Sequence, residues 1–430
     1  MSKIFSFIIV CVFLLNSCNS YSSKYNPKPQ SNDPDFKYKS YKGLVMAGYQ
    51  GWFAADGDES NRGWYHYGFK NDTVASFDFW PDMTEYTKKY VTPFKMADGS
   101  DSYLFSAYDT ESVDLHFRWM KEYGIDGVFM IRFVSETKNE VNKKHFNKVL
   151  ENALNAARKY ERAISIMYDL SGCKSEDMNV LEEDWKELMY IFDLANREKN
   201  PTYLWHNDSP LLSIWGVGFN DGRRYSLDDT RQLVIRLKKD HKISIMLGVP
   251  YFWRTLCIDT QNDPMLHELI KENVDIIMPW AVGRYDHYKY DSMTSGLADD
   301  FKWCRENNVD YVPLVFPGFS WANLFRKPEI YDQIPRMRGD FLWKQVAGAK
   351  EAGANALFVA MFDEIDEGTA IFKCAEEGKV PVFGEVRSER RFVGIEEGLG
   401  SDYYLWLIGQ AANWIHGASG YSQTKPQRIK

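Results

Sequence analysis

Four carboxylates follow an apolar run near the C-terminal end of the chain, and they are the residues best suited to chemistry. The run covers residues 356–362 and is followed at once by Asp363, Glu364, Asp366 and Glu367. A short continuous apolar run indicates a buried strand, so the four acids should lie on one rim of a sheet. Crowded carboxylates raise each other's pKa, which would leave a proton donor near neutral pH.

Glu364 and Glu367 are the best-placed pair for acid–base chemistry on a glycosidic bond. Three residues apart on an irregular turn, they can face one substrate from different directions. Asp363 and Asp366 are expected to bind backbone amides, or Arg and Lys side chains. The Glu-x-x-Glu spacing alone fits a solvated acidic loop that caps a helix equally well, and its position after the last strand of a barrel favours catalysis.

Eight apolar runs alternate with segments of helical periodicity, for example Val113, Phe117 and Met120. Buried runs separated by helices favour a parallel sheet, and eight such units over about 370 residues predict a (β/α)8 TIM barrel in the α/β class. A doubly wound open sheet is the alternative, but no GxGxxG or GxxxxGK[ST] loop follows any run. The runs are 44–49, 127–133, 163–168, 211–215, 243–249, 275–280, 311–316 and 356–362, with 401–416 as the closing helix.

The residues that follow the predicted strands should converge on one pocket. They are mainly aromatic with interspersed charges, which suits a sugar, because its C–H faces stack on rings and its hydroxyls need polar partners. A long insertion after the first strand, residues 51–109, should add a wall to this pocket. The predicted substrate-binding residues are Tyr49, Trp52, His66, Arg132, Asp169, Trp215, Tyr251, Trp253, Arg254, Trp280 and Trp321.

Two of these predictions have plain alternatives. Asp169 could orient a substrate hydroxyl, hold Arg132 or cap a helix, and His66 could be an ordinary surface histidine. No GxSxG elbow is present, so a Ser-His-Asp hydrolase is not supported.

The N-terminal residues have the pattern of an export signal. Residues 1–18 carry one positive charge and an apolar core of about twelve residues, too short for a stable membrane span. Leu15-Asn-Ser-Cys18 resembles a bacterial lipobox, which predicts a lipid anchor on Cys18; ordinary cleavage is the alternative. Asn19 in place of Asp favours the outer membrane. Residues 19–40 are predicted to be a flexible tether, 41–417 the catalytic domain and 418–430 a disordered tail.

Composition excludes several function classes. The formal net charge is −8 and the isoelectric point is about 5.6, without the basic stripe that binds nucleic acid. Nothing requires a metal or another cofactor, and the chain is expected to be a monomer. Beyond the signal and Cys18 the cysteines are Cys173, Cys257, Cys304 and Cys374; none has metal-ligand spacing, and one or two disulfides are possible after export.

The segment Phe362-Asp-Glu-Ile-Asp-Glu-Gly-Thr-Ala370 resembles the Asn-Glu-Trp-His-Glu-Gly-Thr type of segment in family 99 of the glycoside hydrolases, the endo-α-mannosidases, and in the related family 71. The resemblance spans about residues 41–417. Its other matching segments are Gly48–Trp52, Tyr168–Gly172, Pro201–Gly216, Gly248–Arg254 and Ser401–Gly409.

The resemblance implies a retaining α-glycosidase on a (β/α)8 barrel, without a glycosyl-enzyme ester. Glu364 would act as base on the substrate's 2-hydroxyl to give a 1,2-anhydro sugar, and Glu367 as acid and then base. Tyr49 and Tyr251 would contact sugar near the cleavage point. The chain departs from the family at Asp363, where Asn is usual, and at residues 365–366, Ile and Asp in place of Trp and His, so mannan specificity and endo action stay open.

The sequence therefore predicts a lipid-anchored glycoside hydrolase that cleaves an α-linked glycan in a polysaccharide-degrading system. The competing hypothesis is a surface glycan-binding lipoprotein on the same barrel, whose catalysis has decayed, because barrels host many functions. Retention of Glu364 and Glu367 with Gly368 and Thr369 favours the enzyme.

Overall fold

The computed structural model describes residues 37–69, 74–383 and 389–428. The predicted signal, Cys18 and most of the predicted tether lie outside the described residues. Within the described ranges, no helix has both the length and the apolar character needed to cross a membrane.

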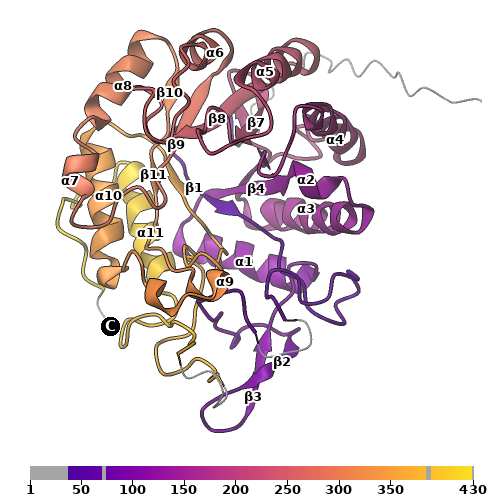
Figure 1. The fold of residues 1–430 in the computed structure, drawn as a ribbon, viewed down its shortest axis with the longest axis vertical. Coiled ribbons are helices and arrows are strands. Elements are labelled where there is room, and N and C mark those ends of the chain that lie inside the picture. Colours follow the sequence, from indigo (N-terminus) through magenta and orange to yellow (C-terminus); the bar gives the residue numbers. More distant parts are fainter. Residues whose placement is uncertain (1–36, 70–73, 384–388, 429–430) are drawn as a thin grey trace, which may run out of the picture. The chain divides into compact units, whose positions relative to one another are not determined.

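Eight strand positions form a parallel barrel that closes on itself (Figure 1). The path of paired strands begins at β10 and ends at β11, which are two halves of one interrupted strand. Hydrogen bonds from the Val312 N–H to the Ile277 carbonyl (2.9 Å) and from the Phe358 N–H to the Pro313 carbonyl (3.0 Å) bridge the interruption. The strands in order are β1 (Val45–Tyr49), β4 (Gly127–Phe133), β5 (Ala163–Asp169), β7 (Ser209–Trp215), β8 (Ser244–Pro250), β9 (Ile276–Trp280), β10 (Asp310–Tyr311), β11 (Leu314–Val315) and β12 (Leu357–Val359). The predicted (β/α)8 barrel is confirmed.

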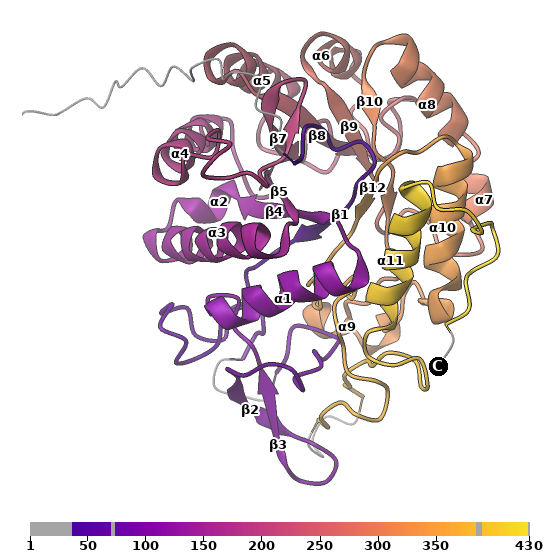
Figure 2. The same cartoon turned by 180° about the vertical axis from the view of Figure 1, so that it is seen from behind.

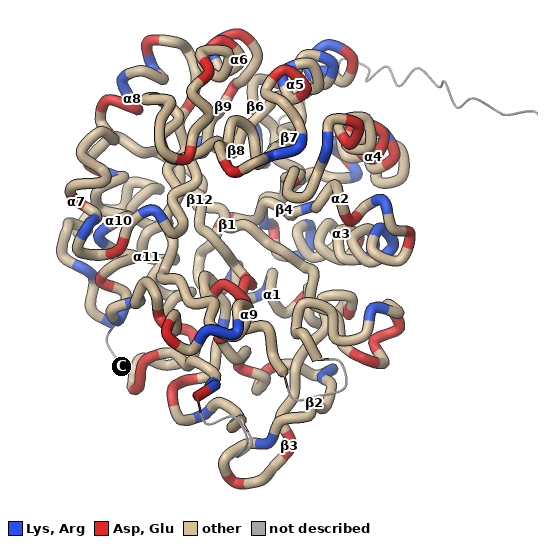
Figure 3. Tube along the Cα trace, viewed as in Figure 1, with Lys and Arg blue, Asp and Glu red and all other residues tan. Residues whose placement is uncertain are grey.

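Helices surround the strands (Figures 1 and 2). The longer ones are α1 (Thr110–Tyr123), α3 (Glu140–Tyr160), α4 (Asp177–Phe192), α5 (Leu227–His241), α6 (Met265–Asn273), α8 (Leu297–Glu306), α10 (Asp340–Glu351) and α11 (Tyr403–Ile415). The short elements are α2 (Val134–Thr137), β6 (Trp205–His206), α7 (Tyr290–Met293), α9 (Ala322–Phe325) and the 3-10 turns Pro328–Ile330 and Met337–Gly339. Acidic and basic residues are interspersed along the outer helices (Figure 3).

Side chains alternate between two buried layers, because successive residues of a strand point to opposite faces. In β4, Val128 and Met130 pack in the layer between strands and helices, whereas Phe129 and Ile131 fill the barrel interior. Close packing in the interior requires glycine at Gly248, where a Cβ would lie 2.4 Å from the Trp215 ring. A glycine in β8 thus makes room for an aromatic ring at the end of β7.

The insertion after β1 folds against the loop that follows β12. It contains the antiparallel hairpin β2 (Tyr90–Lys95) and β3 (Asp101–Leu104), which both views show beside that loop (Figures 1 and 2). The Asp82 N–H donates to the Lys373 carbonyl (2.9 Å), and the Ala375 N–H donates to the Trp80 carbonyl (2.8 Å). The first and last loops at the C-terminal end of the barrel are therefore joined.

Two predictions about the rest of the domain are modified by the structure. Residues 418–428, expected to be disordered, pack on α10 and α11: Arg428 forms two hydrogen bonds with Asp402 (2.7 and 2.6 Å), and the indole of Trp343 donates to the Ser422 carbonyl (3.0 Å). The four cysteines within the described residues are free, and three of them are buried.

Candidate active site

The turn that carries the four acids is held by three segments distant in sequence. The N–H groups of Asp78 and Phe79, in the insertion, donate to the Ile365 carbonyl (3.2 and 3.3 Å). From the loop after β11, the Ser320 N–H donates to the Glu367 carbonyl (2.9 Å), and Arg336 Nη2 donates to the carbonyls of Gly368 and Ala370. Gly368 has a φ of +67°, and a Cβ there would lie 2.8 Å from the Ser320 nitrogen, so the turn needs glycine.

Asp363 fastens the start of the turn to the end of β1. Its two carboxylate oxygens accept the N–H groups of Gln50 (2.8 Å) and Gly51 (2.9 Å), so the predicted backbone-amide partners of Asp363 are confirmed. The Ala360–Met361 peptide bond just before it is cis. Burial raises the pKa of Asp363 to about 7, although the two N–H groups oppose this rise.

Glu364 is buried, with 6% of its surface exposed. The Gln50 side chain and the Thr369 hydroxyl (3.4 Å) are its hydrogen-bond partners. Burial raises the pKa of Glu364 well above its ordinary value, and the negative charges of Glu367, Asp366 and Asp363 raise it further, while the Gln50 hydrogen bond lowers it. Glu364 therefore loses its proton less readily than a free glutamate.

Glu367 lies at the other end of the turn and is more accessible than Glu364. No side-chain hydrogen bond to its carboxyl is found among the residues described. Burial raises the pKa of Glu367 to about 8, with further contributions from the charges of Asp366 and of Asp169 at the end of β5. A carboxyl with this pKa is protonated at pH 7 and can donate its proton to a leaving group.

Asp366 bonds to the insertion. His66 Nδ1 lies 3.2 Å from Asp366 Oδ2, while Asp366 Oδ1 is buried without a hydrogen-bond partner in the described structure. The expectation that Asp366 binds a backbone amide, Arg or Lys is therefore wrong. The His66 ring stacks on Trp52, with centroids 3.7 Å apart and an angle of 8° between the planes.

Partly exposed aromatic rings cap the barrel interior near these acids. Trp215 meets Trp280 edge to face at 5.2 Å, and Trp52 stacks on Phe133 at 5.1 Å. The partly exposed aromatic residues that pack on the interior core are Phe133, Trp215, Tyr251, Trp280 and Trp321. Of the predicted residues, His66, Trp215, Tyr251, Trp280 and Trp321 are partly exposed, whereas Trp52 is buried and stacks on both His66 and Phe133.

Asp169 is the last residue of β5 and lies near the acid cluster. Its charge acts on Glu367, and burial raises its own pKa to about 6. The Arg223 guanidinium lowers that pKa and lies 5.1 Å from the Trp215 ring centre. Asp169 accepts the Ser171 N–H (2.6 Å) and does not hold Arg132.

Four predicted substrate-binding residues point elsewhere. Tyr49 is fully buried between strands and helices, where its hydroxyl pairs with His116 Nδ1 (2.8 Å). Arg132 is buried against Asp184 of α4, with Nε–Oδ2 at 2.5 Å and Nη2–Oδ1 at 2.7 Å. Trp253 is fully buried against Trp303, and Arg254 pairs with Asp300 of α8 (2.5 Å). These placements are at odds with the predicted sugar contacts.

The alternation of strand faces explains these differences and identifies residues that were missed. Because Met46 and Gly48 face the interior, Gln50 follows on that side and Tyr49 does not. In β4 the same rule selects Phe133 over Arg132. Counting every second residue along β1 and β4 from the residues that face the interior therefore leads to Gln50 and Phe133.

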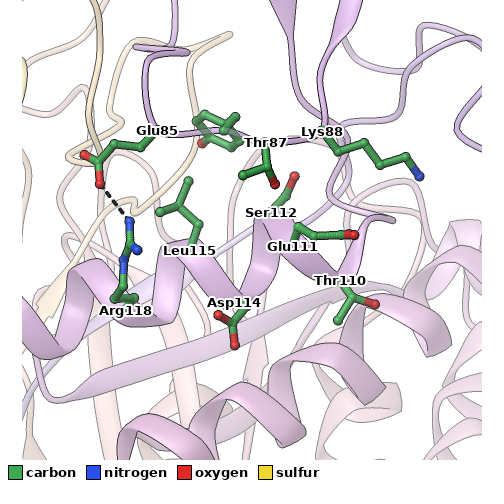
Figure 4. A pocket seen from close by; sticks show the side chains of 10 residues that line it. Glu85, Thr87, Lys88, Thr110, Glu111, Ser112, Asp114, Leu115 and Arg118 are labelled. Carbon is green, nitrogen blue, oxygen red and sulfur yellow. Dashed lines mark hydrogen bonds and ion pairs between the residues drawn. The ribbon is translucent and has the colours of Figure 1, made fainter.

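A separate surface cavity of about 350 Å³ lies at the start of α1, away from the four acids (Figure 4). Its walls bear charges of both signs, including Glu85, which pairs with Arg118 at 2.8 Å. None of the four acids lines this cavity.

The acid cluster can perform acid–base chemistry on a polar, ring-shaped ligand. It combines a carboxyl without a hydrogen-bond donor, a carboxyl with two donors and rings that can stack on a sugar face.

No protein-family model and no curated protein matches the sequence. Among solved structures, the fold is similar to that of the GH99 endo-α-mannosidase from Bacteroides thetaiotaomicron, with a TM-score of 0.62 and 12% identity over 87% of this chain and 97% of that chain. A second structure of that enzyme, in complex with bis-tris-propane, gives 0.60 and 13% over the same shares. A glycoside hydrolase-like protein gives 0.51 and 14% over 80% of this chain and 97% of that chain. At these identities the likeness establishes the fold.

Proposed function

We propose that this protein is a retaining glycoside hydrolase that cleaves an α-linked glycan. The observation that carries the proposal is the pair Glu364 and Glu367, which lies on one turn at the C-terminal end of a TIM barrel. The likeness to an endo-α-mannosidase over 87% of the chain supports it, as does the resemblance of the 362–370 segment.

The proposed reaction proceeds in two displacements. In the first, Glu364 removes the proton of the sugar's 2-hydroxyl, and the 2-oxygen forms a bond to the anomeric carbon. The bond to the leaving oxygen breaks as Glu367 donates its proton to that oxygen. In the second, Glu367 takes a proton from water, and the water oxygen attacks the anomeric carbon. The 2-oxygen departs and recovers its proton from Glu364, so the configuration is retained.

The proposed division of roles follows the position of each glutamate in the 362–370 segment, as its resemblance implies. Gln50 and Thr369 stabilise the ionised form of Glu364, which suits a base. Glu367 has no such donor and a pKa of about 8, which suits an acid. The partly exposed rings, with Asp169 and His66, are proposed to bind the sugar units on either side of the cleaved bond.

Replacing each glutamate by glutamine tests the proposed roles. We expect Glu364→Gln and Glu367→Gln each to lower kcat by at least about 10²-fold, because each removes a proton transfer. Both variants should keep their affinity for substrate and should melt at or above the wild-type temperature, since each removes an acid that burial makes costly to ionise. Reducing-end release, calorimetric binding and thermal melting measure these quantities. Near-wild-type activity in either variant would refute its role.

The substrate class requires a screen of α-mannans, α-glucans and host N-glycans. A hydrolase releases reducing ends from at least one of them, and proton NMR of the first product shows whether the α-configuration is retained. A glycan that binds without release of reducing ends would favour a binding protein. Polysaccharides with β-linkages serve as the matched control and should yield no product.

A further inference from the structure

A row of aromatic side chains lies on the loop after β11. Phe319 meets Trp321 edge to face at 4.7 Å, and Trp321 meets Phe325 in the same way at 4.6 Å. Exposure increases along the row: Phe319 is buried in the interior core, Trp321 is partly exposed, and Phe325, at the end of α9, is 51% exposed. Trp321 and Phe325 together form an aromatic platform that leads outward from the barrel interior.

This aromatic platform begins beside the turn that carries the acids. The Ser320 N–H donates to the Glu367 carbonyl (2.9 Å), and a Cβ on Gly368 would lie 2.8 Å from the same Ser320 nitrogen. Trp321 is the next residue of the chain, and consecutive Cα atoms lie only about 3.8 Å apart. The platform therefore starts within one residue of a backbone contact with Glu367.

Asp78 fixes the loop in place. The carboxylate of this fully buried residue accepts the hydroxyl of Ser320 (2.6 Å) and the N–H groups of Ala322 (2.9 Å) and Asn323 (2.8 Å). The N–H of Asp78 donates to the Ile365 carbonyl of the acid turn (3.2 Å). One residue thus holds both the turn and the loop, so the rings are presented on a rigid support. Rings that are already fixed lose little conformational entropy when they bind a ligand.

A sugar unit suits this platform better than another protein does. A specific protein interface covers about 800 Å² on each partner, whereas the row offers the exposed parts of Trp321, Leu324 and Phe325. The next residues, Arg326 and Lys327, are exposed and can donate hydrogen bonds to hydroxyl groups. Flat ring faces beside polar donors match the C–H faces and the hydroxyls of a sugar.

We propose that Trp321 and Phe325 bind a sugar unit of the glycan on the Glu367 side of the turn, beyond the two sugars joined by the cleaved bond. The substrate is then a chain of at least three sugar units. The assignment of a cleaved bond rests on the proposed function, whereas binding of a glycan to the platform does not depend on catalysis.

Binding without catalysis is the first test. In native gels cast with α-mannan or with α-glucan, at least one polysaccharide should retard the wild type, and Phe325→Ala should lose most of that retardation. Phe325→Trp retains a ring and should be retarded like the wild type. Tyr190→Ala, which removes a 75% exposed ring from α4, is the matched control and should also be retarded like the wild type. Thermal melting checks that each variant is folded.

Steady-state kinetics on a polysaccharide that the enzyme hydrolyses give the second test. Phe325→Ala should raise the KM roughly 3- to 10-fold, the effect of one lost ring contact, with a far smaller change in kcat. Retardation and a KM equal to those of the wild type would overturn the proposal, as would a wild type that neither polysaccharide retards. Retardation that depends on Phe325, without release of reducing ends from any glycan, would refute only the proposed function.

Discussion

The four acids of one turn have different surroundings, because each meets a different set of hydrogen-bond donors. Asp363 accepts two backbone N–H groups just after β1, Asp366 contacts a histidine, and the charge of Glu367 acts on Glu364. The Gln50 side chain favours the ionised form of Glu364, although burial and the neighbouring acids raise the pKa of Glu364 on balance.

Replacing Gln50 by leucine should impair the base. Loss of a hydrogen bond to a charged group amounts to about 1.5–3 kcal/mol, so kcat should fall roughly 10- to 100-fold. The acidic limb of the kcat/KM profile should move to higher pH, because Glu364 loses its proton less readily. Gln232→Leu, on the exposed face of α5, is the control and should behave as wild type. Unchanged kcat and an unchanged acidic limb in Gln50→Leu would contradict this role.

At the scale of elements, strand direction separates residues that bind substrate from residues that hold helices. Arg132 points outward from β4 to Asp184 of α4, and the Tyr168 hydroxyl donates to the same carboxylate (2.6 Å). Neighbouring Phe133 faces the opposite side and packs on the interior core. Two adjacent residues at one strand end thus have unrelated tasks.

Arg132→Met should therefore destabilise the fold. Breaking a buried ion pair leaves Asp184 without its charge partner and costs about 3–5 kcal/mol. The folded fraction should keep the wild-type KM for glycan, because the side chain does not reach the acid cluster. Urea unfolding and steady-state kinetics measure the two effects, with the exposed Arg305→Met of α8 as control. A raised KM without loss of stability would restore Arg132 as a substrate contact.

At the scale of the whole molecule, the site exists because the last strand closes the barrel beside the first. This closure brings Gln50 and Gly51 to Asp363, and the insertion after β1 brings His66 to Asp366, 300 residues away in sequence. Burial of so many carboxyls makes the stability of the domain dependent on pH. Burial raises the pKa of Asp78 and Asp169 to about 6, of Asp363 to about 7 and of Glu367 to about 8.

Stability should therefore fall as the pH rises from about 5 to 8. Over this range the folded chain holds protons that the unfolded chain has lost, at about 1.4 kcal/mol per pH unit for each such carboxyl. His116 and His145, buried and neutral with pKa values lowered to about 3, partly offset the fall below about pH 6.5. Urea unfolding measures the slope, and Glu367→Gln should flatten it. Stability that rises between pH 7 and pH 8 would contradict the burial of these acids.

The order of elements was determined by the sequence alone, because strands buried on both faces must be continuously apolar. All eight predicted strand positions, the closing helix and the (β/α)8 barrel were found, and the acids after residue 362 lie on the expected end of β12. The alternation of side chains along β1 and β4 also predicts that Gln50 and Phe133, rather than Tyr49 and Arg132, face the barrel interior. A local pattern fixes these features, so no distant contact is needed to read them.

Only the tertiary structure decided which partner each charged group would meet. Arg132 with Asp184, Arg254 with Asp300 and His66 with Asp366 are pairs between separate elements, formed when helices and the insertion pack around the closed barrel. A lone charge in a sequence indicates that a partner is needed but not where it lies, since a buried ion can be compensated by any element that packs against it. The pair Glu364 and Glu367 could be predicted from its spacing, whereas the hydrogen-bond donors around it are supplied by the fold.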